Sequence, residues 1–256
     1  AVYRTLTSNQ LVPTAMPYGS VYTYQWAQAG EVENQGIELS AIYRNNSSLF
    51  RYRLALNATA NRNKITQLGT EQILNDYFRL REGDQIGDLY DTNGKRLGST
   101  NPDWLFGLKG AMTYKNWDFD FWIKARLGGE VLSDTERYLD RYGVSQASAT
   151  ARDTENDLLG IPAPYYFQHK PTEKYVYEAT NLRLQRLALT YHFNKISMIK
   201  GFSDFSLSLI ADNVLMLYNK APFDPQLTFG VGTYTAKELF MTPSAATYGA
   251  SLKVQF

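Results

Sequence analysis

A two-residue alternation of apolar and polar side chains recurs along this chain and constrains its fold more than any other feature. In the stretch 49–61, Phe50 and Tyr52 fall on one side of an extended backbone, and Arg51 and Arg53 fall on the other. Similar alternation returns at 118–129 and 204–212. A period of two predicts β-strands with one apolar face, whereas helical periodicity is not sustained over any long stretch. The sequence therefore predicts an all-β fold.

Eight strands are expected, and the connections between them alternate in length. We place the strands near residues 1–12, 32–45, 49–64, 104–115, 118–131, 177–193, 204–216 and 246–256. Near Gln185 and Arg186 the alternation changes phase, which predicts a β-bulge. The long connections are 13–31, 65–103, 132–176 and 217–245, and the short ones lie near 46–48, 116–117 and 194–203. An antiparallel meander of this kind places all the long loops at one end and the tight turns at the other.

The two strand faces differ in a way that bears on their surroundings. One face collects Arg, Lys, Asn and Asp, and the other collects Phe, Leu, Tyr and small residues. Aromatic residues make up 14% of the chain, including 19 tyrosines, and tyrosine suits surfaces that are half wet and half apolar. With the loop asymmetry, this favours an antiparallel transmembrane β-barrel of the outer-membrane type, with an apolar exterior and a wet lumen. A soluble sheet or barrel whose charged face meets solvent is the alternative.

The composition disfavours several other classes of protein. The chain has no cysteine, and its two histidines, His169 and His192, lie far apart, so a thiolate or histidine metal cluster is not expected. Its 26 basic and 25 acidic residues create no strong field toward nucleic acid. Apolar runs stay far short of the ~20 residues that a spanning helix needs. No carboxylate pair has a fixed spacing on a rigid element, so we do not expect an enzyme.

Five stretches, in one order along nearly the whole chain, carry a family resemblance. They are ENQGIELS at 33–40, LGSTNPDWLFGLKGAMTYKNWDFDFWIKARLGGEV at 97–131, YEATNLRLQRLALTYHF at 177–193, LSLIADNVLMLYNKAPFDPQL at 207–227 and YGASLKVQF at 248–256. Together they resemble the barrel of SusC-like, TonB-dependent outer-membrane transporters of Bacteroidetes-type bacteria. The chain departs from the family pattern in its loops, where the stretch after Asn63 is short and Ala179-Thr180-Asn181 replaces a serine-bearing turn.

The resemblance implies an architecture and a location. Residues 1–256 would form the C-terminal part, about eight strands, of a barrel of about 22 strands in the cell outer membrane. The plug and the TonB-binding segment would lie outside this chain, and because AVYRTLTSNQ is no signal peptide, we expect processing or a longer polypeptide. Phe256, a terminal aromatic residue, would be the signal that the barrel assembly machinery reads.

The resemblance also implies a function, namely TonB-dependent import of oligosaccharides or oligopeptides. A SusD-like surface lipoprotein would cover the mouth as a lid, TonB would act through the missing N-terminal region, and membrane lipid would surround the wall. Two alternatives stay open. The barrel would instead be a structural subunit of a larger outer-membrane complex for secretion or barrel assembly, or a small autonomous eight-stranded barrel.

Two groups of residues are candidates for functional sites. The first group follows two prolines in a long loop and would contact the substrate or the lid, with packing inside the loop as the alternative: Tyr165, Tyr166, Phe167 and His169. The second group lies on polar strand faces and would line the lumen or pack against the plug: Arg51, Arg53, Trp122, Lys124 and Arg126.

No cofactor or metal is expected. The stretch Asp91-Thr92-Asn93-Gly94 opens like a calcium loop, but Pro102 stands where an EF-hand needs its bidentate acid, so a solvated turn is the better interpretation. A second acidic stretch, Asp153, Glu155 and Asp157, fits a charged loop better than an ion site. A calcium ion held by such loops stays an unsupported option.

Overall fold

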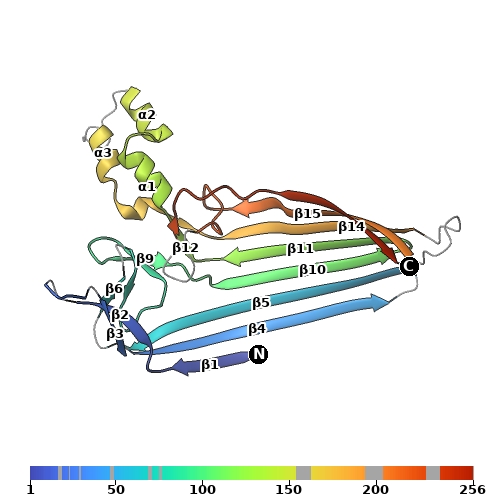
Figure 1. The fold of residues 1–256 in the computed structure, drawn as a ribbon, viewed down its shortest axis with the longest axis horizontal. Coiled ribbons are helices and arrows are strands. Elements are labelled where there is room, and N and C mark those ends of the chain that lie inside the picture. Colours follow the sequence, from blue (N-terminus) through green and yellow to red (C-terminus); the bar gives the residue numbers. More distant parts are fainter. Residues whose placement is uncertain are drawn as a thin grey trace.

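The computed structural model describes residues 1–16, 19–22, 24–28, 30–46, 49–68, 71–74, 77–153, 163–193, 204–228 and 237–255. Its main feature is one eight-stranded antiparallel sheet (Figure 1). The strands are β1 (Val2–Thr7), β4 (Glu31–Asn46), β5 (Phe50–Gln67), β10 (Trp104–Tyr114), β11 (Trp117–Leu127), β14 (Asn181–Phe193), β15 (Asp204–Asn219) and β17 (Thr247–Gln255). They pair in sequence order, with β1 and β17 at the two edges. The predicted eight-strand meander is confirmed.

The long and short connections lie at opposite ends of this sheet. Figure 1 shows β6, β9, β12 and the helices beyond one end. At the other end, Lys115-Asn116 forms a two-residue turn that joins Tyr114 to its cross-strand partner Trp117. Lys115 adopts the left-handed conformation (φ 52°), and Asn116 donates from Nδ2 to the carbonyl of His192 at 2.7 Å. The turn therefore lies one residue before the expected Asn116-Trp117, because Trp117 already belongs to β11.

The predicted β-bulge is present at Gln185. Trp122 of β11 pairs with Arg186, and the next residue, Ile123, pairs with Leu184, so Gln185 has no partner on that strand. In a regular strand, residues three positions apart point to opposite faces. The extra residue places Arg183 and Arg186 on the same face, which keeps the polar side of the strand polar along its whole length.

The first strand is shorter than the sequence indicates. β1 ends at Thr7, and Asn9 follows in a left-handed conformation (φ 58°). Leu11, which was expected at the end of the first strand, instead begins a separate hairpin of β2 (Leu11–Ala15) and β3 (Tyr24–Gln28).

The longer loops fold into small units with cores of their own. Their strands are β6 (Gln72–Ile73), β7 (Arg79–Leu80), β8 (Asp88–Tyr90), β9 (Arg96–Ser99), β12 (Glu130–Ser133), β13 (Val176–Glu178) and β16 (Lys237–Glu238). Their helices are α1 (Asp134–Arg141), α2 (Gln146–Asp153), α3 (Ala163–His169) and the 3-10 helix η1 (Thr172–Tyr175). Five buried side chains join two of these loops into one core: Tyr77, Phe78, Leu89, Leu132 and Tyr175. The loops thus form a packed cap beyond one end of the sheet.

Candidate functional site

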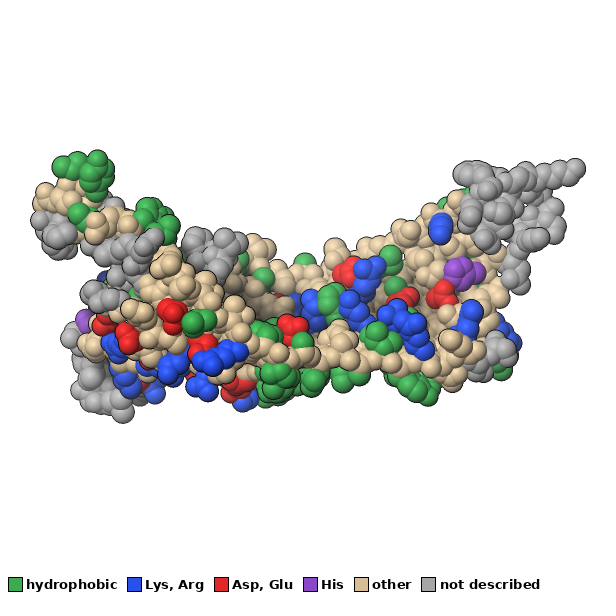
Figure 2. All heavy atoms as spheres, turned by 90° about the horizontal axis from the view of Figure 1, so that it is seen from below, with side chains coloured by type: hydrophobic (Ala, Val, Ile, Leu, Met, Phe, Trp, Pro, Cys, Tyr) green, Lys and Arg blue, Asp and Glu red, His purple; other side chains and the backbone are tan. Residues whose placement is uncertain are grey.

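The eight-stranded sheet has one apolar and one polar face. Cross-strand partners share a face, so the apolar face runs from Leu39 through Ala58 and Phe106 to Ala125 and Leu182. Large side chains on it are exposed, and Leu39 keeps 57% of its surface open. Figure 2 shows hydrophobic side chains along the convex edge of the molecule and charged side chains in the hollow opposite. An apolar surface of this extent requires a cover of lipid or protein.

Aromatic rings border the apolar face toward both ends. Near the turns, Trp117 lies 4.7 Å from Tyr191 between ring centroids. Near the cap, Trp104 stacks on Phe106 at 5.7 Å. β10 has 11 residues, and at roughly 3.4 Å per residue and a tilt of about 40° it spans about 26 Å in height. That height matches the apolar band of about 25 Å that transmembrane barrels present between two aromatic girdles.

The polar face contains a hollow of about 580 Å³ near its middle. Its walls come from β5, β10, β11 and β14, and small residues such as Ala111 leave the space open. The charged and aromatic side chains that line the hollow are Arg53, Lys109, Asp120, Trp122 and Arg186.

Trp122 lies at the centre of this basic lining. Lys124 Nζ is 4.0 Å from the centroid of the indole ring, and Lys109 Nζ is 4.5 Å from it. Ammonium groups at these distances are attracted to the ring. Within the part of the chain that the structure describes, neither lysine forms an ion pair with a carboxylate. The hollow therefore presents positive charge around an aromatic ring, which suits an anionic ligand.

The structure places the five lumen candidates on the polar face, in different roles. Arg53 and Trp122 line the hollow, and the ammonium group of Lys124 lies over the ring of Trp122. Arg51 is exposed one alternation step nearer the turns. Arg126 lies at the cap end and donates to the carbonyl of Thr100 at 2.6 Å, so it fastens the cap to the sheet. Whether these side chains line a lumen stays a prediction.

The four aromatic-loop candidates lie in or at α3, away from the hollow. Phe167 is buried, and its ring meets that of Tyr166 edge-on at 5.5 Å. His169 is exposed, and the side chain of Tyr165 lies outside the described residues. The burial of Phe167 favours a packing role for that residue, while contact with a substrate or a lid stays a prediction for the group.

The sequence analysis did not identify a buried polar cluster at the base of the cap. Arg183 of β14 donates to the side chains of Asn213 and Asp224, which come from β15 and the loop that follows it. Asn213 is left-handed (φ 52°) and donates in turn to the carbonyl of Ala245 at 3.0 Å. Burial opposes ionisation of Asp224, but the hydrogen bonds from Arg183 and from the backbone of Gln226 outweigh it and lower the pKa of this carboxyl. The sequence did carry a pointer to this cluster, because Asn213 and Asp224 lie in the stretch 207–227 that resembles the family.

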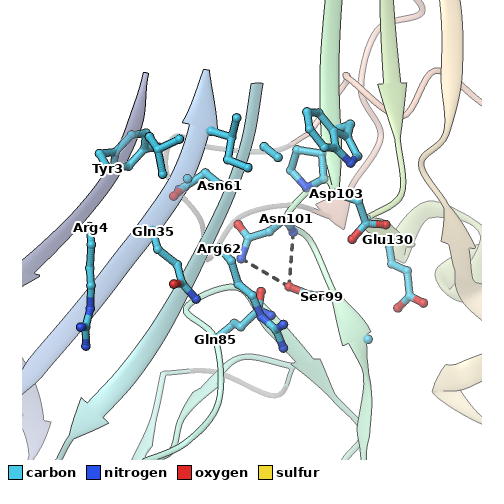
Figure 3. Close-up of a pocket in the computed structure, with 18 of the residues that line it drawn as sticks. Tyr3, Arg4, Gln35, Asn61, Arg62, Gln85, Ser99, Asn101, Asp103 and Glu130 are labelled. Atoms are coloured by element: carbon cyan, nitrogen blue, oxygen red, sulfur yellow. Dashed lines mark hydrogen bonds between the residues drawn. The ribbon is translucent and has the colours of Figure 1, made fainter. Parts of the chain in front are cut away.

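A larger cavity of about 1020 Å³ lies where the cap end of β5 separates from the chain leading into β10 (Figure 3). We call this cavity the slot. Arg4, Gln35 and Arg62 line one side, and Arg96 and Glu130 come from the cap. Burial raises the pKa of Glu130, whose Oε2 is buried without a hydrogen-bond partner among the described residues.

The carboxylate of Asp91 binds backbone N–H groups of its own turn. Asp91 Oδ1 accepts hydrogen bonds from the backbone N–H groups of Asn93 at 2.9 Å and Lys95 at 2.7 Å, which closes the turn. Across the described residues, no group of three or more His, Cys, Asp or Glu side chains is arranged to hold a metal ion. Glu155 and Asp157 lie outside the described residues.

None of the described helices is both long enough and apolar enough to cross a membrane.

The strand order, the alternating connections and the two opposed faces define an antiparallel transmembrane β-barrel wall, of which this chain forms eight consecutive strands. The chain belongs to the TonB-dependent receptor family, because the family described as "TonB dependent receptor-like, beta-barrel" matches residues 1–214. The predicted resemblance is thereby confirmed.

Three relatives illustrate the similarity. TonB-dependent receptor P3 of Formosa agariphila is 26% identical over 89% of this chain and 28% of its own length. TonB-dependent receptor SusC of Bacteroides thetaiotaomicron is 23% identical over 98% of this chain and 29% of its own length. Among solved structures, the RagAB peptide transporter superposes with a TM-score of 0.78 at 18% identity, covering 100% of this chain and 33% of the matched chain. The chain thus spans less than a third of the two curated relatives.

Proposed function

We propose that this chain is the C-terminal barrel wall of a SusC-like importer in the outer membrane, which takes up oligosaccharides or oligopeptides with energy from TonB. The observation that carries the proposal is the pairing of an apolar face, about one membrane tall, with a polar face that holds a basic, aromatic hollow. Membership of the TonB-dependent receptor family supports it.

The cap is the part of this chain that would meet a partner or a substrate. Its helices α1, α2 and α3 project beyond the sheet (Figure 1), as a loop that reaches a lid must do. We propose a SusD-like lipoprotein as that lid. The relatives' names support this indirectly, since they include SusC and the RagAB peptide transporter. Phe256 lies outside the described residues, and its role in assembly stays a prediction.

The test uses the full-length polypeptide that contains this chain, in its own host. Strains with and without the gene, and with and without TonB, are fed mixed oligopeptides or mixed oligosaccharides, and depletion of each component is followed by mass spectrometry. We expect the same components to persist in the gene deletion and in the TonB deletion. Uptake that is unchanged in the gene deletion would contradict import and favour the structural-subunit alternative.

A second measurement addresses the lid. The polypeptide is purified in mild detergent from outer membranes and its partners are identified by mass. We expect a surface lipoprotein in stoichiometric amount, and its absence would contradict the proposed lid while leaving the import experiment as an independent test.

A further inference from the structure

The apolar face of the sheet ends abruptly toward the cap. On β1, β4 and β5 the last apolar row consists of Val2, Ile37 and Ala60. The next row toward the cap holds Arg4, Gln35 and Arg62, and all three side chains lie on the same face as the apolar row. One alternation step, which is two residues along each strand, therefore takes the surface from aliphatic to strongly polar. A membrane surface changes character over a similarly short distance, at the level of its headgroups.

The slot opens across this boundary. Its end nearer the apolar row is lined by Ile37 and Trp104, and its end nearer the cap by Arg62 of β5 and by Gln85 and Asn101, while the carboxylates of Asp103 and Glu130 lie on the side away from β5. Figure 3 shows Arg4, Gln35 and Arg62 extending the same way from three neighbouring strands, with Arg62 reaching toward Gln85. One cavity thus places an apolar wall next to the guanidinium of Arg62.

Arg62 carries the charge that is available to a ligand there. Arg4 is already held by Glu33 through two hydrogen bonds of 2.8 Å, and Arg96 is held by Asp88 at 2.7 and 2.9 Å. Arg62 is exposed and has no ion pair with any carboxylate of the described ranges. A guanidinium binds phosphate or carboxylate through parallel hydrogen bonds, and phosphate is the group that membrane lipids present at this level.

Lys64 adds a second cation one step further from the apolar row. It lies opposite Glu33 on β4 and shares the face of Arg62. Because Glu33 is engaged by Arg4, the charge of Lys64 is only partly offset. Basic residues just outside the apolar band attract anionic headgroups, by about 1 kcal/mol for each Lys or Arg near the surface.

We propose that the slot binds the phosphate-bearing headgroup of a membrane lipid on the cap side, whose acyl chains lie along the apolar face beside Ile37 and Trp104. A free anion would bind Arg62 but would make no contact with the apolar wall, whereas a lipid carries phosphate and hydrocarbon in one molecule and can contact both. The inference uses the membrane placement of the apolar face and not the import activity, so uptake and lipid binding are tested separately.

The experiment uses the full-length protein in detergent with two probes, lipid A that carries its phosphates and the same lipid A without them. Bound lipid is counted by native mass spectrometry. The variant is Arg62→Gln, and the control is Arg51→Gln, an exposed arginine on the polar face of the same strand. Unchanged mobility on unheated gels shows that each variant is folded.

We expect the wild type and Arg51→Gln to retain the phosphorylated lipid, and Arg62→Gln to retain about fivefold less. We also expect little retention of the dephosphorylated lipid by any form. Equal retention by Arg62→Gln and the wild type would overturn the site. Equal retention of both lipids would indicate an adventitious lipid only, and displacement by excess inorganic phosphate would reassign the site to a free anion. Either result would overturn the proposal.

Discussion

Arg183 and Asp224 form an ion pair in which the two side chains keep only 6% and 9% of their surface exposed. The pair joins β14 to the loop that follows β15, at the point where the sheet meets the cap. Asn213 accepts a further hydrogen bond from Arg183, and Pro225 beside Asp224 is fully buried. A single arginine thus fixes the course of a loop of the cap.

Replacement of Asp224 by alanine should release this loop. Removing one partner of a buried pair leaves the other charge without compensation and costs about 3 kcal/mol or more. Local opening of residues 220–228 should then rise by about 100-fold, since each 1.4 kcal/mol is about a factor of ten. The rate of protease cleavage in this segment measures the change.

Asp212→Ala is the matched control. Asp212 pairs with Arg186 at 3.7 Å, and both side chains are nearly half exposed, so solvent screens the pair and its loss should change cleavage little. Equal cleavage of Asp224→Ala and the wild type would show that the ion pair does not hold the loop.

The stability of this loop should also depend on pH through the carboxylate of Asp224. The pKa of Asp224 is lowered in the folded state, so its contribution to stability is fully present above the ordinary aspartate pKa of about 4. That contribution is lost as the pH falls through the lower folded pKa. Protection of residues 220–228 should be constant from about pH 5 to 8 and decline below about pH 4. Asp224→Asn should be poorly protected throughout, and a wild-type decline near neutral pH would contradict the assignment.

Gly36 should not tolerate a side chain. A Cβ at this position would lie 2.6 Å from the carbonyl oxygen of Ala60 and 2.6 Å from the ring of Tyr3. Because the backbone oxygen cannot move aside without disturbing β5, Gly36→Ala should destabilise the barrel by about 1–3 kcal/mol. Gly107→Ala is the control, since its added Cβ would meet only the indole nitrogen of Trp122, at an ordinary contact distance of 3.7 Å, and β10 is paired on both sides. The temperature at which the folded barrel loses its fast gel mobility should fall for Gly36→Ala alone.

The bulge at Gln185 shows how far the sequence predicts this fold. The alternation of apolar and polar residues changes phase between Leu184 and Arg186 in the sequence. A strand with one face toward the membrane can change phase only by inserting an extra residue, so the phase change predicts the bulge. The same constraint made the eight strands predictable to within a few residues. The polar-face position of Trp122 and its lysine neighbours followed from alternation as well.

The cap was not predictable in the same way. The fold of the cap depends on contacts between residues that are distant in sequence, such as the parallel strand pairing of Ser133 with Glu238. Side chains that hold it, such as Arg126, which bonds to the backbone of Thr100, carry no local pattern. The burial of Phe167 likewise follows from the packing of short helices that have no sustained periodicity.

Deletion of Gln185 tests the bulge directly. Because Gln185 is the extra residue, its removal leaves Leu184 next to Arg186, and regular alternation then keeps Arg186, Thr190 and His192 on the polar face. The deletion variant should therefore assemble. Deletion of Ala188 is the contrasting variant, because it turns Thr190 and His192 toward the apolar face unless the bulge straightens and places Arg186 there instead. An arginine near the middle of a membrane costs about 2–4 kcal/mol on the lipid side of a barrel, so this variant should assemble poorly. Assembly is read from the amount of folded protein in outer membranes, and failure of the Gln185 deletion with normal assembly of the Ala188 deletion would contradict the register.

The central claim is that the apolar face meets lipid and the polar face meets water, and single cysteines test it most directly. The chain contains no cysteine of its own, so Arg53→Cys and Leu56→Cys on β5 can be compared in intact outer membranes, provided that any native cysteine elsewhere in the full-length polypeptide is removed. We expect a small, water-soluble maleimide to label Arg53→Cys readily and Leu56→Cys only after detergent denaturation. Rapid labelling of Leu56→Cys in the intact membrane, with Arg53→Cys protected, would contradict the account.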